Sequence, residues 1–201
     1  MVELRRGAFI AIEGVDGAGS TTQTGLLVES LKKQGYPAIA TKEPNPEGKL
    51  EPVIRTLLRD ERTVPTMDAL LFAADRVDHM EKVIKPSVAS KLIVVTDRYF
   101  ESSIAYQKAE GLDEKWIISI NRNVIEPDLT IILDIDPDLS LKRKSMDPDR
   151  FENVAFLSKV RNNFLERAKM KGYLVIDAMK PSKEVHQDIL RATLAIVKGL
   201  I

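Results

Sequence analysis

Cysteine is absent from this chain, which excludes disulfides, zinc–thiolate sites and thiol nucleophiles. Net charge is absent too, because 30 Lys and Arg residues balance 30 Asp and Glu residues, so no overall field would hold the protein on DNA or on an anionic membrane. Aromatic residues make up only 5% of the chain and are not interleaved with a basic stripe, which disfavours nucleic-acid binding. Partners must therefore be recognised locally.

Long apolar runs are also missing. No segment approaches the roughly 20 apolar residues that cross a bilayer, and the first six residues have no apolar run like that of a secretory signal. We therefore expect a cytoplasmic protein. A chain of 201 residues is long enough to bury one substantial core, and no repeat or Pro/Gly/Ser-rich linker divides it. One domain spanning residues 1–201 is expected.

Short apolar runs rich in β-branched residues alternate with segments of helical periodicity. The runs are nearly continuous, as in a parallel sheet covered on both faces, and the alternation predicts a doubly wound α/β fold. Expected strands cover residues 8–13, 38–41, 92–97, 129–134 and 174–177. Expected helices cover residues 22–34, 52–60, 67–90, 102–109, 115–123, 139–145, 154–171 and 183–200. Residues 43–49 and 144–153 are expected to form mobile loops.

The first expected strand runs into a glycine-rich turn, Gly14-Val15-Asp16-Gly17-Ala18-Gly19-Ser20-Thr21-Thr22, and a helix follows. This is the layout of a Walker A motif, in which glycines let backbone N–H groups wrap closely around phosphate. Thr21 stands where a hydroxyl would ligate Mg²⁺. At position 20 the motif requires a lysine that reaches the β- and γ-phosphates, and this chain has serine. The turn therefore predicts an ATP-binding P-loop that lacks one cation.

Two other interpretations of this turn stay open. A glycine-rich junction between strand and helix can be merely a tight turn, although both the strand context and the glycine spacing match the motif. The second is a P-loop that binds nucleotide without turnover, because cations that stabilise the transferred group are worth about 10³–10⁵ in rate. Loss of the lysine thus implies either a substitute cation or slow turnover.

A carboxylate and a guanidinium follow the third expected strand, in the sequence Asp97-Arg98-Tyr99. In an open α/β sheet, ligands bind at the carboxyl ends of the strands. There Asp97 can hold Mg²⁺ or its water, and Arg98 can clamp phosphate oxygens with a bidentate fork. The alternative is an Asp–Arg pair that caps the next helix.

An aromatic ring and a guanidinium share one face of the long expected helix 67–90. Phe72 and Arg76 are four residues apart, so the ring can stack on a base while the guanidinium hydrogen-bonds the edge of that base. Taken by itself, the pattern favours ordinary core packing for Phe72 with a surface pair of Asp75 and Arg76.

Taken together and in order, these motifs resemble the thymidylate kinase family of P-loop nucleoside monophosphate kinases. The resemblance covers nearly the whole chain and rests on Gly14–Thr21, Lys42-Glu43-Pro44, Phe72-Ala-Ala-Asp-Arg76, Asp97-Arg98-Tyr99, Ser102-Ser-Ile-Ala-Tyr106-Gln107 and Asp149-Arg150-Phe151-Glu152. It implies a three-layer P-loop NTPase fold, with a five-stranded parallel sheet flanked by helices and a short lid. It also implies Mg²⁺-assisted phosphoryl transfer from ATP to dTMP, and a homodimer.

The resemblance assigns roles around the acceptor nucleotide. In the family, the aromatic matching Phe72 stacks on thymine and the arginine matching Arg76 hydrogen-bonds the base edge. Asp16 corresponds to an aspartate that meets the sugar 3′-hydroxyl, and Tyr106 would press on the sugar and discourage a 2′-hydroxyl. Arg98 would hold the monophosphate and help position the transfer. The other positions that the family places at the base or the monophosphate pocket are Ser103, Gln107, Glu43 and Pro44.

The basic segment that begins at Lys142 resembles the family lid, which closes over ATP and is expected over residues 142–153. Some members of the family place an arginine in the P-loop, and others keep basic residues in the lid; residues 15–18 of this chain contain no arginine. Our hypothesis is that Arg143 or Arg150 supplies the charge that Ser20 cannot. The alternative is that the charged residues of this segment form only a solvent-exposed face and take no part in catalysis. His79, one turn past Arg76, is expected at the surface or at an interface.

The sequence thus predicts a dTMP kinase. Its catalytic residues would be Asp97, Arg98, Arg143 and Arg150, with Thr21 and Asp97 holding Mg²⁺. A kinase for another pyrimidine monophosphate, such as dUMP, UMP or CMP, is one alternative. A nucleotide-binding protein that is catalytically impaired is the other.

Overall fold

The computed structural model describes residues 2–59, 64–143 and 153–201. Five parallel strands form one sheet in the order β2-β3-β1-β4-β5. They are β1 (Ala8–Gly14), β2 (Ala38–Lys42), β3 (Ile93–Asp97), β4 (Leu129–Asp134) and β5 (Leu174–Asp177). Every residue of the central strand β1 is buried, which explains its continuous apolar run. The predicted five-stranded parallel sheet in an α/β fold is confirmed.

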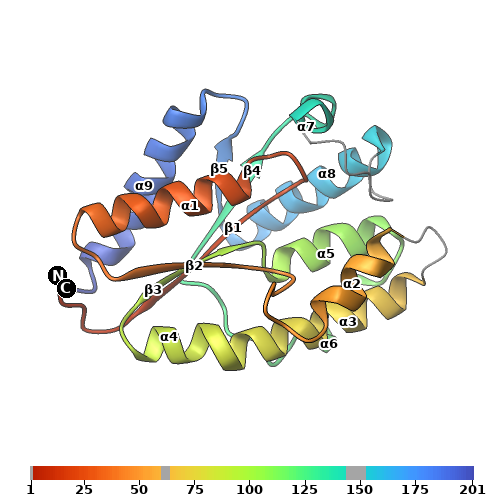
Figure 1. The fold of residues 1–201 in the computed structure, drawn as a ribbon. Helices are drawn as coiled ribbons and strands as arrows, with labels where there is room; N and C mark the ends of the chain where they lie inside the picture. The colour runs from red at the N-terminus through yellow and green to blue at the C-terminus, as the bar shows by residue number, and fades with distance from the viewer. Residues whose placement is uncertain (1, 60–63, 144–152) are drawn as a thin grey trace.

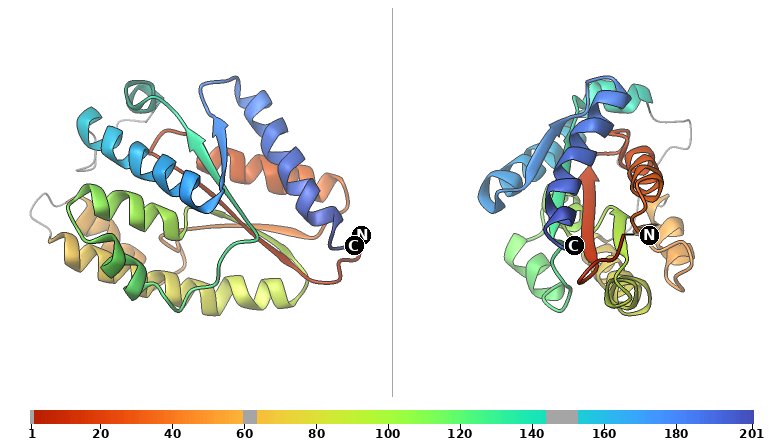
Figure 2. Two further views of the ribbon diagram at one scale, coloured as in Figure 1. Left: turned by 180° about the vertical axis from the view of Figure 1, so that it is seen from behind. Right: turned by 90° about the vertical axis from the view of Figure 1, so that its left-hand side faces the viewer.

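Helices cover both faces of the sheet, as Figures 1 and 2 show. On one face α1 (Ser20–Lys33) packs beside α9 (Ser182–Lys198), and on the other α5 (Phe100–Ala109) packs beside α8 (Val154–Lys171). The shorter helices are α2 (Glu51–Leu58), α6 (Glu114–Ile120) and α7 (Pro137–Arg143). None of the helices in the described ranges is long and apolar enough to cross a membrane.

The long helix expected over residues 67–90 is divided into three parts. An α-helix, α3 (Pro65–His79), continues through a π-helical turn, η1 (Met80–Ile84), into a short α-helix, α4 (Lys85–Ala89). Pro86 lacks a backbone N–H, so it cannot make the α-helical bond to the carbonyl four residues earlier. The π turn lies just before this proline. The helix expected over this stretch is therefore confirmed, with a π turn that periodicity alone did not reveal.

The loop that follows β2 is fastened to α3. The backbone N–H of Asn45 donates to Asp75 Oδ2 at 2.8 Å, and both residues are buried. Glu43 accepts from Arg76 at 2.8 Å. This part of the predicted mobile loop 43–49 is therefore held by buried polar contacts. Residues 144–152, which include Arg150 and make up most of the second predicted mobile loop and of the expected lid, lie outside the described residues.

A buried ion pair joins α5 to α8 on one face of the sheet. Arg167 donates to both carboxylate oxygens of Glu101 at 2.8 Å, and each side chain is only 4% exposed. The hydroxyl of Tyr173 donates to the same carboxylate at 2.9 Å. A buried carboxylate is tolerated when it is paired and hydrogen-bonded, and it becomes costly when its partner is removed.

We therefore expect Arg167→Ala to lower the free energy of unfolding by about 3–5 kcal/mol, because Glu101 would be left buried without its cation. Chemical denaturation measures this change. Lys171→Ala is the matched control on the same helix, since among the described residues Lys171 makes only an exposed pair with Glu126 at 3.7 Å, and its loss should cost less than about 1 kcal/mol. Equal losses for the two variants would contradict the expectation.

Candidate active site

Two cavities adjoin at the carboxyl edge of the sheet, and Asp16 and Arg98 line both of them. The first, which we call the acceptor cavity, has a volume of about 230 Å³ and lies between α2, α3 and α5. The second, which we call the donor cavity, is lined by residues 16–23 and has a volume of about 700 Å³. This larger volume lies within the range of small-molecule sites.

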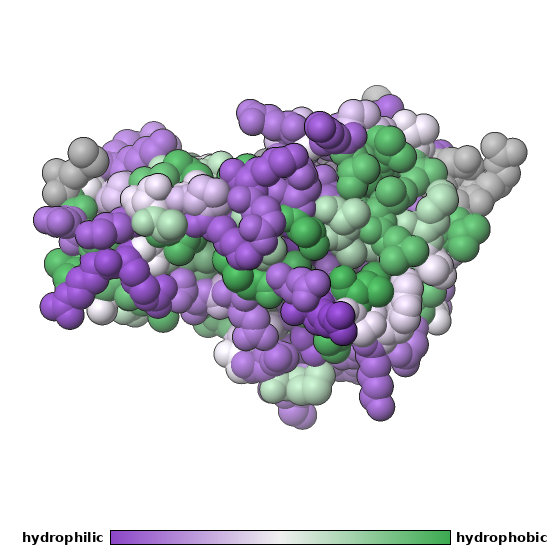
Figure 3. Space-filling model, turned by 90° about the horizontal axis from the view of Figure 1, so that it is seen from below, coloured by the Kyte–Doolittle hydropathy of each residue, from purple (hydrophilic) through white to green (hydrophobic). Residues whose placement is uncertain are grey.

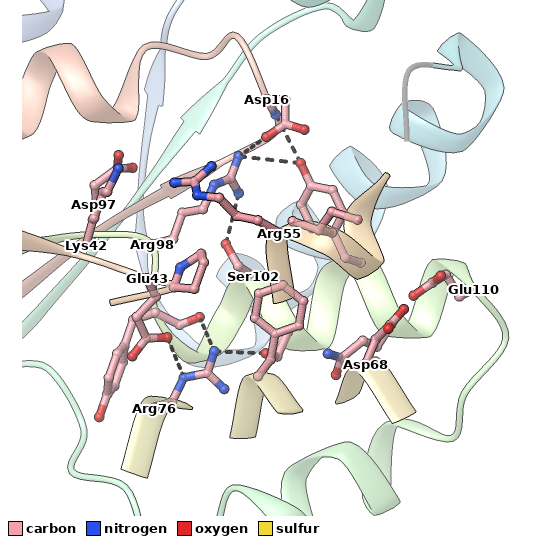
Figure 4. A pocket seen from close by; sticks show the side chains of 17 residues that line it. Asp16, Lys42, Glu43, Arg55, Asp68, Arg76, Asp97, Arg98, Ser102 and Glu110 are labelled. Atoms are coloured by element: carbon pink, nitrogen blue, oxygen red, sulfur yellow. Dashed lines mark hydrogen bonds and ion pairs between the residues drawn. The ribbon is translucent and has the colours of Figure 1, made fainter. Parts of the chain in front are cut away.

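All nine residues that the sequence assigned to the acceptor nucleotide line the acceptor cavity. They are Asp16, Glu43, Pro44, Phe72, Arg76, Arg98, Ser103, Tyr106 and Gln107. Figure 4 labels four of them, Asp16, Glu43, Arg76 and Arg98, which point toward one another from the P-loop, the loop after β2, α3 and the turn after β3. Their binding roles stay predictions, but the structure brings the whole set together.

The P-loop adopts a backbone that needs glycine at two places. Gly17 and Gly19 have φ angles of 77° and 96°, in the left-handed region that side chains disfavour. A Cβ on Gly17 would lie 2.2 Å from the carbonyl oxygen of Ser140, so α7 also leaves no room there. The Ser140 hydroxyl donates to the carbonyl of Asp16. The loop is thus held open toward the donor cavity by its own backbone and by α7.

Not every residue of the predicted P-loop, Gly14–Thr22, lines the donor cavity. The stretch from Asp16 to Thr22 lines it, whereas Gly14 and Val15 do not. Val15 is 2% exposed and belongs to the hydrophobic core, so only its backbone is available for phosphate. The Gly14 carbonyl accepts a hydrogen bond from Arg98 instead.

Arg98 lies between the two cavities and is held from several sides. Its Nη1 donates to the Gly14 carbonyl at 2.7 Å and to Ser102 Oγ at 3.0 Å, and its Nη2 donates to Asp16 Oδ1 at 2.5 Å. The guanidinium carbon lies 5.4 Å from the centre of the Tyr106 ring. Burial acts to lower the pKa of Arg98, but Tyr106 and Asp16 outweigh it and the pKa is raised. The arginine therefore stays charged at the junction (Figure 4).

A hydroxyl and a carboxylate meet beside the P-loop in the manner expected of a magnesium site. Thr21 Oγ1 donates to Asp97 Oδ2 in a short hydrogen bond. Asp97 is 6% exposed, and its Oδ1 is buried without a hydrogen-bond partner among the described residues. Mg²⁺ prefers oxygen ligands and usually takes only one or two from protein, with waters and phosphates completing its octahedron. The unpartnered oxygen and the neighbouring hydroxyl fit that requirement.

Arg76 is fully buried, being 1% exposed, and most of its donors are already used. Its partners are Glu43 at 2.8 Å, Asn121 at 2.6 Å, the Tyr99 carbonyl at 3.1 Å and Ser103 at 2.9 Å. A guanidinium has five N–H groups, so these four bonds leave one N–H for a ligand. Phe72 lies beside it, half-buried in the acceptor cavity.

The alternative interpretation of this helix, with Asp75 and Arg76 as a surface pair, was wrong. Both are 1% exposed, because α3 packs between the loop after β2 and α5. Burial raises the pKa of Asp75, and the hydrogen bond from the Asn45 N–H acts in the opposite direction. Desolvation of this carboxyl is therefore only partly offset by its backbone partner.

The expectation that His79 lies at the surface or at an interface was also wrong. The side chain is 0% exposed, with Nε2 at 2.6 Å from Thr41 Oγ1 and Nδ1 at 3.3 Å from Glu43 Oε1. Three residues after Arg76, it falls on the same buried face of α3. His79 does not reach the cavity but supports Glu43, which in turn holds Arg76.

Sequence reasoning missed several residues that line the cavities. Arg55, Asp68 and Glu110 line the acceptor cavity, where they come from α2, α3 and the end of α5. Lys180 lines the donor cavity from the loop between β5 and α9 and pairs with Asp188 at 3.2 Å. No local motif marks these positions, because only the packing of distant elements brings them to the site.

One of the two predicted lid arginines lies within the described residues. Arg143, at the end of α7, lines the donor cavity and donates to the Ala178 carbonyl at 2.9 Å. Together with Arg98 and Lys180 it makes the donor cavity cationic although Ser20 carries no charge. Arg150 lies outside the described residues.

Comparison with known proteins agrees with this geometry. A family profile described as "Thymidylate kinase" matches residues 12–189. A probable thymidylate kinase of Pyrobaculum calidifontis is 45% identical over 186 residues, covering 90% of this chain and 93% of the relative. The probable thymidylate kinase of Thermococcus onnurineus is 43% identical, covering 90% of this chain and 95% of the relative. That of Pyrobaculum aerophilum is 42% identical, covering 95% of this chain and 98% of the relative. The chain therefore belongs to the thymidylate kinase family of nucleoside monophosphate kinases.

Proposed function

We propose that this chain transfers the γ-phosphoryl group of ATP to dTMP, yielding dTDP and ADP. The observation that carries the proposal is that the donor and acceptor cavities meet at Arg98 and Asp16. A group that passes from one nucleotide to another must cross such a junction. A pure binding protein has no need of a second cavity lined by Phe72, Arg76 and Tyr106.

Catalysis would consist of positioning and charge stabilisation, because phosphoryl transfer requires little covalent participation by the protein. Backbone N–H groups of Gly17 and of residues 19–22 would hold the phosphates of ATP, and Arg98 would meet the charge on the transferred group. Thr21 and Asp97 would hold Mg²⁺, a proposal supported by their contact and by the unpartnered Oδ1 of Asp97 among the described residues. When bound, the ion would neutralise phosphate charge.

The acceptor cavity supports selection of a deoxyribonucleotide with a pyrimidine base. Phe72 offers a stacking surface, and the remaining N–H of Arg76 can donate to an acceptor on the base edge. Tyr106 is held by the Asp16 N–H, which donates to its hydroxyl at 3.0 Å. A fixed ring on the sugar face would resist an added 2′-hydroxyl.

The test is release of ADP with ATP and Mg²⁺ and, in turn, dTMP, dUMP, UMP and CMP. We expect dTMP to be preferred and turnover to cease when EDTA removes Mg²⁺, because the P-loop lacks its lysine and depends on other cations. Preference for another monophosphate would favour the alternative kinase. Turnover that appears only in Ser20→Lys would identify a catalytically impaired protein.

We further propose that Arg143 or Arg150 supplies the charge that Ser20 cannot, and of the two we favour Arg143. In support, Arg143 lines the donor cavity together with the P-loop. Ser20 is only 7% exposed and begins α1, so its short side chain cannot reach the β- and γ-phosphates as a lysine would.

Arg143→Ala should lower kcat at least about 100-fold, because one preorganised donor to a developing charge is worth about 10²–10³. Ser20→Lys should raise kcat by far less. Lys142→Ala is the matched control. The substitution removes a positive charge from the neighbouring position of α7, and Lys142 does not line the donor cavity. Steady-state kinetics with saturating dTMP distinguishes these cases. If Arg143→Ala keeps the kcat of Lys142→Ala, the proposal for Arg143 is wrong.

We also propose that the chain forms a homodimer through α3. This helix is buried along Ala69, Ala73 and Arg76, yet its opposite face exposes Met67, Leu70 and Val77. Val64, just before α3, and Ile118 of α6 are exposed as well. Figure 3 shows hydrophobic side chains gathered on the underside of the molecule. A helix that is apolar on both faces calls for a partner on the second face.

Leu70→Glu should convert the dimer to a monomer, because it places a charge on the exposed stripe of α3, where Leu70 is 49% exposed. Light scattering coupled to gel filtration measures the mass. The control is Met170→Glu, which introduces the same charge at a 64% exposed position of α8 and should leave the dimer intact. A monomeric wild-type chain, or a dimer that persists in Leu70→Glu, would refute the proposal.

A further inference from the structure

Glu13 is a fully buried carboxylate next to the P-loop. It is the last residue but one of β1, and its exposure is 0%. Its Oε1 accepts hydrogen bonds from the backbone N–H groups of Tyr99 at 3.0 Å and Glu101 at 3.1 Å. Its Oε2 accepts from the Ser102 hydroxyl at 2.5 Å. All three donors belong to the segment that immediately follows Arg98.

That segment needs an external acceptor. Helix α5 begins at Phe100, and its N-cap residue, Tyr99, makes no side-chain hydrogen bond to the first turn. The first N–H groups of a helix have no partner within the helix and are usually satisfied by a short polar side chain at the N-cap. Tyrosine cannot serve in this way. The carboxylate of Glu13, coming from a different strand, takes that role.

Arg98 itself is held in an unfavourable backbone conformation. Its φ is 69°, in the left-handed region that is unfavourable for a residue with a side chain. Its N–H donates to the Ile12 carbonyl at 2.9 Å, and its carbonyl accepts from the Thr96 hydroxyl at 2.8 Å. The strain persists only where the surroundings hold it, and one side of this turn is held by Glu13.

We propose that Glu13 is a positioning residue, which fixes the guanidinium of Arg98 at the junction of the donor and acceptor cavities. It acts along two routes. The first is the backbone of Tyr99 and Glu101, which closes the turn after Arg98. The second is Ser102, whose hydroxyl donates to Glu13 and accepts from Arg98 Nη1 at 3.0 Å.

The cost of this carboxylate supports the assignment. Burial raises the pKa of Glu13 to about 7, although the Ser102 hydrogen bond and the charge of Arg98 act to lower it. Burial away from water destabilises the charged form of a carboxyl group unless hydrogen bonds within the protein replace those to water. Glu13 does not line either of the two cavities, so a direct role toward nucleotide is not open to it.

This inference rests on the proposed kinase activity, and kinetics with ATP and dTMP test both. We expect Glu13→Ala to lower kcat about 100-fold, the loss expected from a misplacement of about 1 Å. The KM for ATP should change less than about threefold, because the P-loop N–H groups bind the ground state. Glu13→Gln should recover kcat to within about tenfold, since the amide oxygen can still accept both backbone N–H groups.

Leu31→Ala is the control for a general loss of stability, since Leu31 is buried near the C-terminal end of α1 and lines neither cavity, so this variant should keep the wild-type kcat below its unfolding temperature. A Glu13→Ala variant with kcat within threefold of wild type, or a Gln variant as slow as Ala, overturns the positioning role. If Glu13→Ala does not fold, Ser102→Ala decides, with at least a tenfold loss of kcat expected and an unchanged kcat overturning the role. A wild-type chain inactive with every monophosphate refutes the proposed function itself.

Discussion

The ion pair between Arg98 and Asp16 is the contact on which the arrangement of the site depends. Arg98 follows β3 and Asp16 follows β1, and these strands are neighbours in the sheet with Ile12 opposite Asp97. The two turns therefore leave the sheet side by side. Their opposite charges lie 2.5 Å apart at the only boundary that both cavities share among the described residues. Because each residue lines both cavities, the pair ties the geometry of one cavity to that of the other.

Behind this junction, a second buried network shapes the acceptor cavity. Arg76 donates hydrogen bonds to Glu43 in the loop after β2, to Asn121 at the end of α6 and to Ser103 in α5. One guanidinium therefore links three separate elements. His79 holds the other oxygen of Glu43. Buried polar networks are costly when incomplete and rigid when complete. The near-complete set of partners around Arg76 explains how a cavity lined by side chains of distant elements keeps a defined shape.

The missing lysine changes the electrostatics of the donor cavity less than the motif alone suggests. Arg98, Arg143 and Lys180 reach the same cavity from three other parts of the chain. The P-loop itself is fixed by its glycines and by the contact of α7 with Asp16 and Gly17. The backbone of the P-loop is thus held in a defined shape without the lysine. The cationic charge of the donor cavity comes from residues outside the motif.

By itself, the sequence determined the strands, the P-loop and nine of the residues that line the acceptor cavity. Continuous apolar runs and glycine spacing are local signals of a covered parallel sheet and a phosphate turn, and the order of the motifs pointed to the family. The tertiary structure alone decided that His79 and Asp75 are buried, that a π turn interrupts the helix before Pro86, and that Arg55 and Lys180 line the cavities. Local periodicity shows which residues share a face, but not what packs against it, because that depends on elements far apart in the chain.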